Sequence, residues 1–109
     1  MRKFTSVSIA MLVGAMLLQG NAAVAQGARE RIAGERLSRD LCSQCHIVSE
    51  TQRGPALDGV PSFLDLGRSK RTDAQLRAWL TDPHPPMPKV PLSEREIFSV
   101  IAYIRSFSD

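Results

Sequence analysis

Two cysteines and a histidine lie together in the segment Cys42-Ser43-Gln44-Cys45-His46, which has the pattern C-x-x-C-H. Residues three positions apart on a helix lie about one turn from each other, so both thiols could reach one edge of a flat ring system. The adjacent imidazole could then bind a metal at the centre of that ring. C-x-x-C-H is typical of covalent haem attachment, in which two thioethers hold the porphyrin and histidine ligates the iron. The sequence therefore predicts one haem c, bound through Cys42, Cys45 and His46.

The same residues allow three other kinds of site. A dithiol redox centre also uses C-x-x-C, but it favours a βαβ context, and no β-rich segment precedes Cys42. Both cysteines and both histidines could together supply the ligands of a structural zinc site, although their spacing matches no zinc-finger pattern. A disulfide between the two cysteines would close a very short loop and would leave His46 without a role. Haem attachment is the interpretation that uses the whole motif.

The N-terminal segment is typical of a secretory signal peptide. Basic residues follow Met1, an apolar run extends from Val7 to Leu18, and Ala23-Val24-Ala25 forms an A-x-A cleavage site. The apolar run is shorter than the ~20 residues that span a bilayer, so an uncleaved anchor is the minor alternative. We expect cleavage after Ala25, export to the periplasm, a single mature domain over residues 26–109, and no stable membrane insertion.

The charge of the precursor does not describe the mature chain. The full sequence has fourteen Lys and Arg against eleven Asp and Glu, a net charge of +3. Loss of Arg2 and Lys3 with the signal peptide leaves twelve against eleven, a net charge of +1. Two ionised haem propionates would bring the holoprotein to about −1. This balance does not indicate a nucleic-acid partner, and the run Arg68-Ser69-Lys70-Arg71 is more typical of a solvated loop than of a docking site.

The mature chain opens with a predicted helix from Ala28 to about Cys45. The apolar residues near one of its faces are Ile32, Ala33, Leu37 and Leu41. Gly34 would cost about 1 kcal/mol relative to alanine in a helix interior. A glycine at this position is explained if another helix crosses closely at Gly34. The alternative is a tolerated glycine on an exposed face.

Two later helices are predicted from capping boxes. Thr72-x-x-Gln75 opens a helix that ends at Asp82, before Pro83, and its inner face carries Leu76, Trp79 and Leu80. Ser93-x-x-Glu96 opens a helix to about Phe107, with an apolar stripe formed by Ile97, Val100, Ile101 and Ile104. The segment 47–71 is irregular because glycine and proline recur in it, and one short helix fits around residues 62–66. The fold class is therefore all-α, and we expect the last helix to pack across the first.

A proline-rich loop separates these two helices and contains Met87. Five prolines occupy the nine positions from Pro83 to Pro91. Such a loop is stiff and can hold one side chain in a fixed place. Met87 is also the only methionine left once the signal peptide is removed. We predict Met87 as the second axial ligand of the iron. His84 is the main competitor, and Lys89 is a weaker one because its amine must first lose a proton.

With these elements in view, nearly all of the mature chain resembles the small monohaem class I c-type cytochromes. The resemblance implies an all-α, class I cytochrome c-like fold, with crossing N- and C-terminal helices and a haem inserted between helices and loops. It implies that Cys42 and Cys45 form the thioethers and that His46 and Met87 are the axial ligands. It also implies that the carbonyl of Pro55 accepts a hydrogen bond from the proximal imidazole, which fixes the tautomer and raises the basicity of the ligand.

The resemblance also assigns residues around the helix crossing. Gly34 matches the small residue at that crossing, and Tyr103 matches the aromatic that the last helix brings to it. Ser38 departs from the family, which often carries a bulky side chain four residues before the first cysteine. We therefore expect Leu37 and Leu41 to pack the first helix against the haem edge.

The resemblance implies a one-electron carrier with transient redox protein partners, a donor and an acceptor, and not an enzyme. Two filled axial positions leave no open site for a substrate, and we expect a monomer. Trp79 or Arg53 could bond to the haem propionates, although core packing is the preferred interpretation of Trp79. One alternative function is a haem-based gas or redox sensor in which Met87 is displaced. Another is a cytochrome subunit bound permanently to a dehydrogenase or an oxidase.

Overall fold

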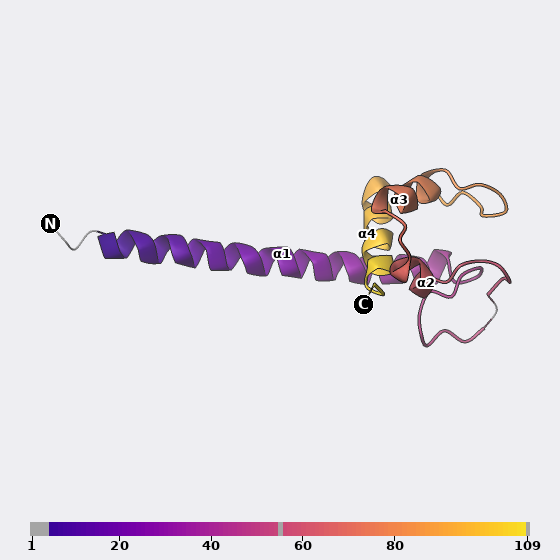
Figure 1. Ribbon diagram of the computed structural model, residues 1–109, viewed down its shortest axis with the longest axis horizontal. Coiled ribbons are helices and arrows are strands. Elements are labelled where there is room, and N and C mark those ends of the chain that lie inside the picture. The colour runs from indigo at the N-terminus through magenta and orange to yellow at the C-terminus, as the bar shows by residue number, and fades with distance from the viewer. Residues whose placement is uncertain (1–4, 55, 109) are drawn as a thin grey trace.

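Four α-helices form the described part of the chain. The computed structural model describes the backbone of residues 5–54 and 56–108, and the side chains of this part from residue 20 onward. It contains α1 (Thr5–Leu41), α2 (Phe63–Arg68), α3 (Asp73–Thr81) and α4 (Glu94–Arg105), and no strand among the described residues. The predicted all-α class is confirmed. Figure 1 shows α1 as a long rod, with the other three helices gathered around its C-terminal part.

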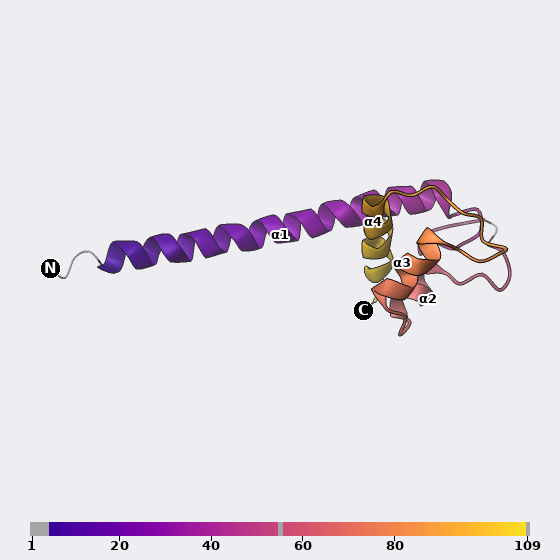
Figure 2. The ribbon, with the colours of Figure 1, turned by 90° about the horizontal axis from the view of Figure 1, so that it is seen from above.

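α1 is one continuous helix, so the predicted start at Ala28 is wrong for the full chain. No proline lies between Thr5 and Leu41 to stop it, and the segment is rich in good helix formers such as Ala, Leu and Met. Its N-terminal half extends away from the other helices (Figures 1 and 2), and the molecule therefore measures 74 × 28 × 25 Å. Within the described part of the chain, no helix combines the length and the apolar character that crossing a bilayer requires.

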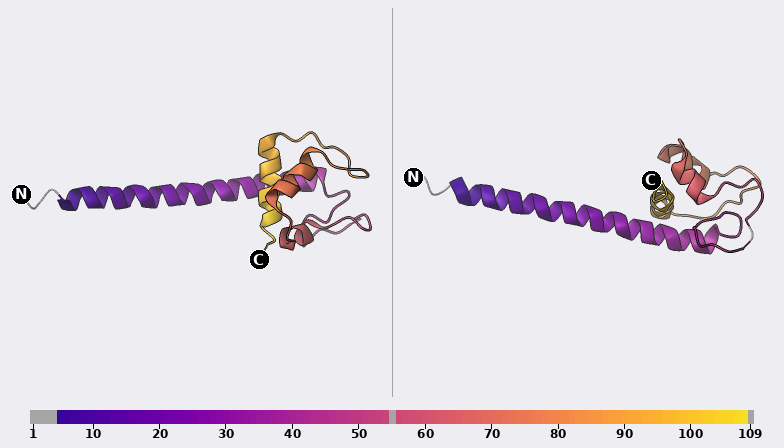
Figure 3. Two further views of the ribbon diagram at one scale, coloured as in Figure 1. Left: turned by 45° about the horizontal axis from the view of Figure 1, so that its top comes forward. Right: turned by 60° about the horizontal axis from the view of Figure 1, so that its bottom comes forward.

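α4 crosses α1 at Gly34. A Cβ atom placed on Gly34 would lie 1.9 Å from the carbonyl oxygen of Ser99 and 2.9 Å from the Cβ of Tyr103. Any side chain there would overlap the backbone of α4, so glycine alone permits this approach. The close crossing expected at Gly34, with Tyr103 beside it, is confirmed. Figure 3 shows from two further directions that α4 lies across the rod of α1.

The buried face of α1 differs from the predicted one. Glu30, Gly34 and Ser38 are buried, whereas Ile32 and Leu41 are 54% and 45% exposed. The prediction placed Ile32 on the inner face and was wrong for it. Leu41 was expected to pack against the haem edge, and that packing stays a prediction. Because Gly34 must face α4, the residues one turn before and after it also face α4, and Ile32 lies on the far side of the helix. The hydroxyl of the fully buried Ser38 donates to the carbonyl of Gly34 at 2.6 Å.

A polar contact accompanies this crossing. The carboxylate of Glu30, 6% exposed, accepts a hydrogen bond from the hydroxyl of Ser99 at 2.5 Å and one from the guanidinium of Arg95 at 3.1 Å. A buried carboxylate needs such partners, because its transfer from water is otherwise costly. Since Arg95 is largely exposed, the contact with Ser99 is the part of this cluster that is shielded from solvent.

The core lies between α4 and the short helices. The predicted α4 stripe is buried, and it packs with residues from α2, α3 and the loop after α1; the members are Val48, Phe63, Leu66, Leu76, Ile97, Val100, Ile101, Tyr103 and Ile104. Both predicted capping boxes are present, at Thr72 and Ser93. α2 also approaches α4 closely, because a Cβ on Gly67 would lie 2.4 Å from the carbonyl oxygen of Ile104.

Gly34→Ala is expected to lower the free energy of unfolding by roughly 3 kcal/mol, because the added methyl group forces the two helix backbones apart. Gly27→Ala is the matched control in the same helix, since nothing lies within 4 Å of a Cβ placed there. That control is expected to be close to neutral, because cleavage after Ala25 would make Gly27 the second residue of the mature chain, outside the helix interior. Urea unfolding followed by far-ultraviolet circular dichroism measures both. Equal effects of the two changes would contradict the close crossing.

Tyr103→Phe is expected to cost about 1–2 kcal/mol at neutral pH, because the buried hydroxyl donates to the carbonyl of Val48 at 2.6 Å. Burial, with the charge of Glu35, raises the pKa of Tyr103 above its ordinary value of 10.0, and Arg39 opposes this rise. The neutral phenol therefore contributes its full stability below pH 10, and this contribution is lost as the pH rises through the folded-state pKa. Urea unfolding between pH 7 and pH 11 should show a shallower alkaline decline for Tyr103→Phe than for the unmodified chain. Identical alkaline slopes would refute this role of the phenol.

Candidate functional site

The C-x-x-C-H motif follows α1 directly and forms one helix-like turn. The carbonyl of Cys42 accepts hydrogen bonds from the backbone N–H groups of Cys45, at 3.1 Å, and His46, at 2.9 Å. Both cysteines are free thiols and half-buried, so the disulfide alternative does not describe this structure. The one-turn spacing of the thiols matches the geometry expected from the sequence.

The imidazole of His46 is held from two sides. Its Nδ1 lies 2.7 Å from the carbonyl oxygen of Pro61, and its ring packs on that of Phe63 with 5.5 Å between centroids. A carbonyl only accepts, so this partner assigns the proton to Nδ1 and leaves the Nε2 lone pair available for a metal. A backbone carbonyl was expected at this position from Pro55, which lies outside the described residues.

The His46 ring is connected to the core through further aromatic contacts. Phe63 packs against Tyr103 at 6.4 Å between centroids, and Tyr103 packs edge-on against Phe107 at 5.2 Å. The backbone N–H of Phe63 also donates to the carbonyl of Ile47 at 2.8 Å. This bond connects Ile47, the residue after the motif, to the start of α2. The imidazole contacts the same aromatic cluster that packs α2 against α4.

The chemistry of the thiols does not favour a dithiol redox centre. Burial raises the pKa of the Cys42 thiol from 9.0 to about 11, and the neighbouring Cys45 adds to the rise. A thiol–disulfide oxidoreductase requires the opposite, a thiolate stabilised at neutral pH. In the part of the chain that the structure describes, no three His, Cys, Asp or Glu side chains group as a metal site would need. The described residues therefore do not form the zinc site that was considered as an alternative.

Met87 lies on a separate loop at the same end of the molecule. The loop between α3 and α4 and the segment between α1 and α2 both project beyond the C-terminal end of α1 (Figures 1 and 3). Met87 is half-buried and its backbone N–H donates to the carbonyl of His84 at 3.2 Å, whereas the side chain of His84 is exposed. The structure thus joins Cys42, Cys45 and His46 in one turn, and it leaves Met87 on the separate loop between α3 and α4.

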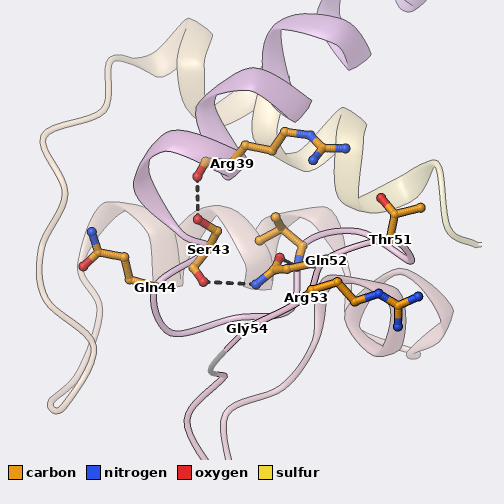
Figure 4. A pocket seen from close by; sticks show the side chains of 8 residues that line it. Arg39, Ser43, Gln44, Thr51, Gln52, Arg53 and Gly54 are labelled. Atoms are coloured by element: carbon orange, nitrogen blue, oxygen red, sulfur yellow. Dashed lines mark hydrogen bonds between the residues drawn. The ribbon is translucent and has the colours of Figure 1, made fainter.

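A pocket of about 590 Å³ borders the motif (Figure 4). Its lining residues are Arg39, Ser43, Gln44, Val48, Thr51, Gln52, Arg53 and Gly54. Neither the two cysteines nor His46 and Met87 belong to this lining, so the pocket is not the candidate haem site. Arg53, one of the residues suggested for the propionates, lies here. Trp79, the other, is half-buried against the core, and the guanidinium of Arg71 lies 4.2 Å from its ring centroid.

Two contacts of the site were missed by the sequence analysis. One is the carbonyl of Pro61. The other is the side chain of Gln52, whose Oε1 accepts from the backbone N–H of Val48 at 2.8 Å, while its Nε2 donates to the carbonyls of Ser43, at 3.1 Å, and His46, at 3.0 Å. Figure 4 shows the Gln52 amide pointing toward Ser43. All of these partners are backbone atoms, and no residue type in the sequence signals them.

The donor set fits a covalently bound haem. Two free thiols one turn apart, followed by an imidazole whose Nδ1 is already bonded, are the groups that thioether attachment and axial ligation require. Met87 adds a thioether sulfur on a proline-rich loop. The residues present could therefore hold a haem c, with His46 as the ligand whose tautomer the protein has set.

Comparison with known proteins agrees with this chemistry. The chain is 39% identical over 74 residues to cytochrome c-552 of Bradyrhizobium diazoefficiens, a match that covers 67% of this chain and 70% of that relative. No protein-family model matches the chain, and no solved structure matches it significantly. Identity at this level, over this share of both chains and together with the all-helical fold, establishes the family. The chain belongs to the small c-type cytochromes.

Proposed function

We propose that the protein is a periplasmic one-electron carrier in which a single haem c is bound covalently by Cys42 and Cys45, with His46 and Met87 as axial ligands. The observation that carries this proposal is the hydrogen bond between Nδ1 of His46 and the carbonyl of Pro61, directly after a turn with two free thiols. It leaves one imidazole nitrogen for the iron and makes that nitrogen a better donor. The similarity to a cytochrome c-552 supports the coarser part of the proposal, an electron-carrying c-type cytochrome.

Each residue has a separate task in the proposed carrier. When bound, the haem supplies the Fe(II)/Fe(III) couple. Cys42 and Cys45 fix the porphyrin to the end of α1. His46 is oriented by Pro61 and Phe63, and the sulfur of Met87 would favour the ferrous state. Because both axial positions would be filled, the protein would bind no substrate at the iron and would exchange electrons through small, transient contacts with its donor and acceptor.

The export and domain assignments are part of the same proposal. Residues 1–25 would be a cleaved signal peptide, and residues 26–109 a single cytochrome domain. The pattern of basic start, apolar run and A-x-A site supports cleavage after Ala25. Cleavage would remove most of the portion of α1 that extends away from the other helices (Figure 1). The crossing at Gly34 would remain intact, because Glu30, Gly34 and Ser38 all follow the cleavage site.

Visible spectra test the ligand assignment. The purified protein is expected to give low-spin c-type spectra, a far-red sulfur-to-iron band in the ferric state, and no change when carbon monoxide is added to the ferrous state. Met87→Ala should abolish the far-red band and permit carbon monoxide binding, whereas the neighbouring His84→Ala should change neither. Carbon monoxide binding by the unmodified protein would instead indicate a sensor with a displaceable ligand. Complete absence of haem would refute the proposal.

Mass spectrometry of the periplasmic fraction tests export and attachment together. We expect a chain that begins at Gln26 and has 84 residues, the 109 of the precursor less 25. Its mass should include one haem even after denaturation, and Cys42→Ala combined with Cys45→Ala should remove that added mass. Recovery of a haem protein that retains residues 1–25 in the membrane fraction would favour the anchored alternative and contradict cleavage after Ala25.

A further inference from the structure

We infer that Gln52 is a positioning residue for the proposed iron ligand His46, an inference that rests on the proposed function and assigns it one more residue. The side chain of Gln52 makes three hydrogen bonds, and all three partners are backbone atoms of the motif turn or of the residues directly after it. The Gln52 amide thus acts on the path of the chain through the motif, and it makes no hydrogen bond to a motif side chain.

The partners of Gln52 lie on both sides of His46. Its Nε2 donates to the carbonyls of Ser43 and His46, and its Oε1 accepts from the backbone N–H of Val48. Carbonyls at the end of a helix have no partner within the helix and otherwise need water or a cap. The carbonyls of Ser43 and His46 lie two and five residues past the end of α1 at Leu41, and Gln52 supplies their donor. The Oε1 atom of the same amide holds the chain beyond His46 through the N–H of Val48. One side chain thereby holds the His46 carbonyl and the chain just after it, in addition to the backbone bond between the His46 N–H and the Cys42 carbonyl.

Gln52 is itself held in place. Its backbone N–H donates to the carbonyl of Ser49 at 3.2 Å, which closes a turn between the motif and the following loop. Val48 is fixed at its other end as well, because its carbonyl accepts from the hydroxyl of Tyr103. Both ends of the segment 48–52 are therefore held by hydrogen bonds. A movement of the Gln52 amide would consequently displace the backbone of His46.

The position of the His46 backbone decides whether the imidazole reaches Pro61. Among the described residues, the ring has one hydrogen-bond partner, the Pro61 carbonyl, at 2.7 Å, and a small rotation of the backbone would lengthen that bond. A longer bond leaves the imidazole less basic, and a less basic axial ligand stabilises the ferric state less. Loss of the Gln52 amide should consequently raise the reduction potential, although the hydrogen bonds of Gln52 go to backbone atoms and not to the imidazole or the thiols.

Gln52→Leu in the full holoprotein tests the inference, with Gln44→Leu as the matched control. Gln44 lies in the same turn and lines the same pocket, and within the described part of the chain its side chain makes no hydrogen bond. Two readouts are needed: the reduction potential and the hydrogen exchange of the Val48 amide. We expect Gln52→Leu to raise the potential and to speed that exchange about tenfold, as the loss of one hydrogen bond allows, whereas Gln44→Leu should change neither.

Gln52→Glu removes the donor function of the amide and keeps its acceptor function. It also replaces the leucine variant as a test if Gln52→Leu folds poorly. A carboxylate can still accept from the Val48 N–H but has no N–H group for the carbonyls of Ser43 and His46. Exchange at Val48 should therefore remain slow in this variant. Fast exchange at Val48 in Gln52→Leu with an unchanged reduction potential would show that Gln52 only stabilises the turn, and it would overturn the inference. The same potential and the same exchange as the unmodified protein would also overturn it. Neither result would affect the proposed function, which is tested on the unmodified protein by its visible spectra and by mass spectrometry.

Discussion

The contact of the α1 and α4 backbones at Gly34 is the constraint on which the rest of the structure depends. Because a Cβ at that position would overlap the Ser99 carbonyl, the contact fixes how α1 is rotated about its axis. Ser38 and Cys42 follow Gly34 at intervals of four residues, so the same rotation turns the first cysteine of the motif toward the core, where it is half-buried. The crossing of two helices thus determines where the C-x-x-C-H turn begins.

From α4 the same contact extends to the imidazole. Tyr103 follows Ser99 by one helical turn; its hydroxyl binds the carbonyl of Val48 and its ring packs on Phe63, which packs on His46. The site is therefore connected to the crossing along two routes, through α1 to the cysteines and through α4 to the histidine. Main-chain carbonyls recur along these routes, with those of Pro61, Ser43, His46 and Val48 each accepting from a side chain.

That reliance on the backbone explains what the sequence could and could not predict. The motif, the capping boxes at Thr72 and Ser93 and the buried stripe of α4 are local patterns, and the structure contains all of them. The fold class follows from these patterns and was predicted correctly. The buried face of α1 was not, because hydrophobicity favoured Ile32, whereas the short distance to α4 selected a glycine and a serine. Pro61 and Gln52 were missed because carbonyl acceptors exist at every position, and only the folded path shows which one a side chain reaches.

The packing of the His46 ring has a consequence for the speed of electron exchange. An electron moves quickly between two proteins when the ligands of the donor and acceptor centres change position little as the charge changes, so that little reorganisation energy is needed. His46 lies between a carbonyl and a phenyl ring, and that phenyl ring is wedged against Tyr103 in the interior of the protein. A displacement of the imidazole would have to repack this interior, which is as dense as a crystal of small molecules. In the proposed carrier, the rigidity of the hydrophobic core would therefore lower the reorganisation energy of the metal centre and speed its electron exchange.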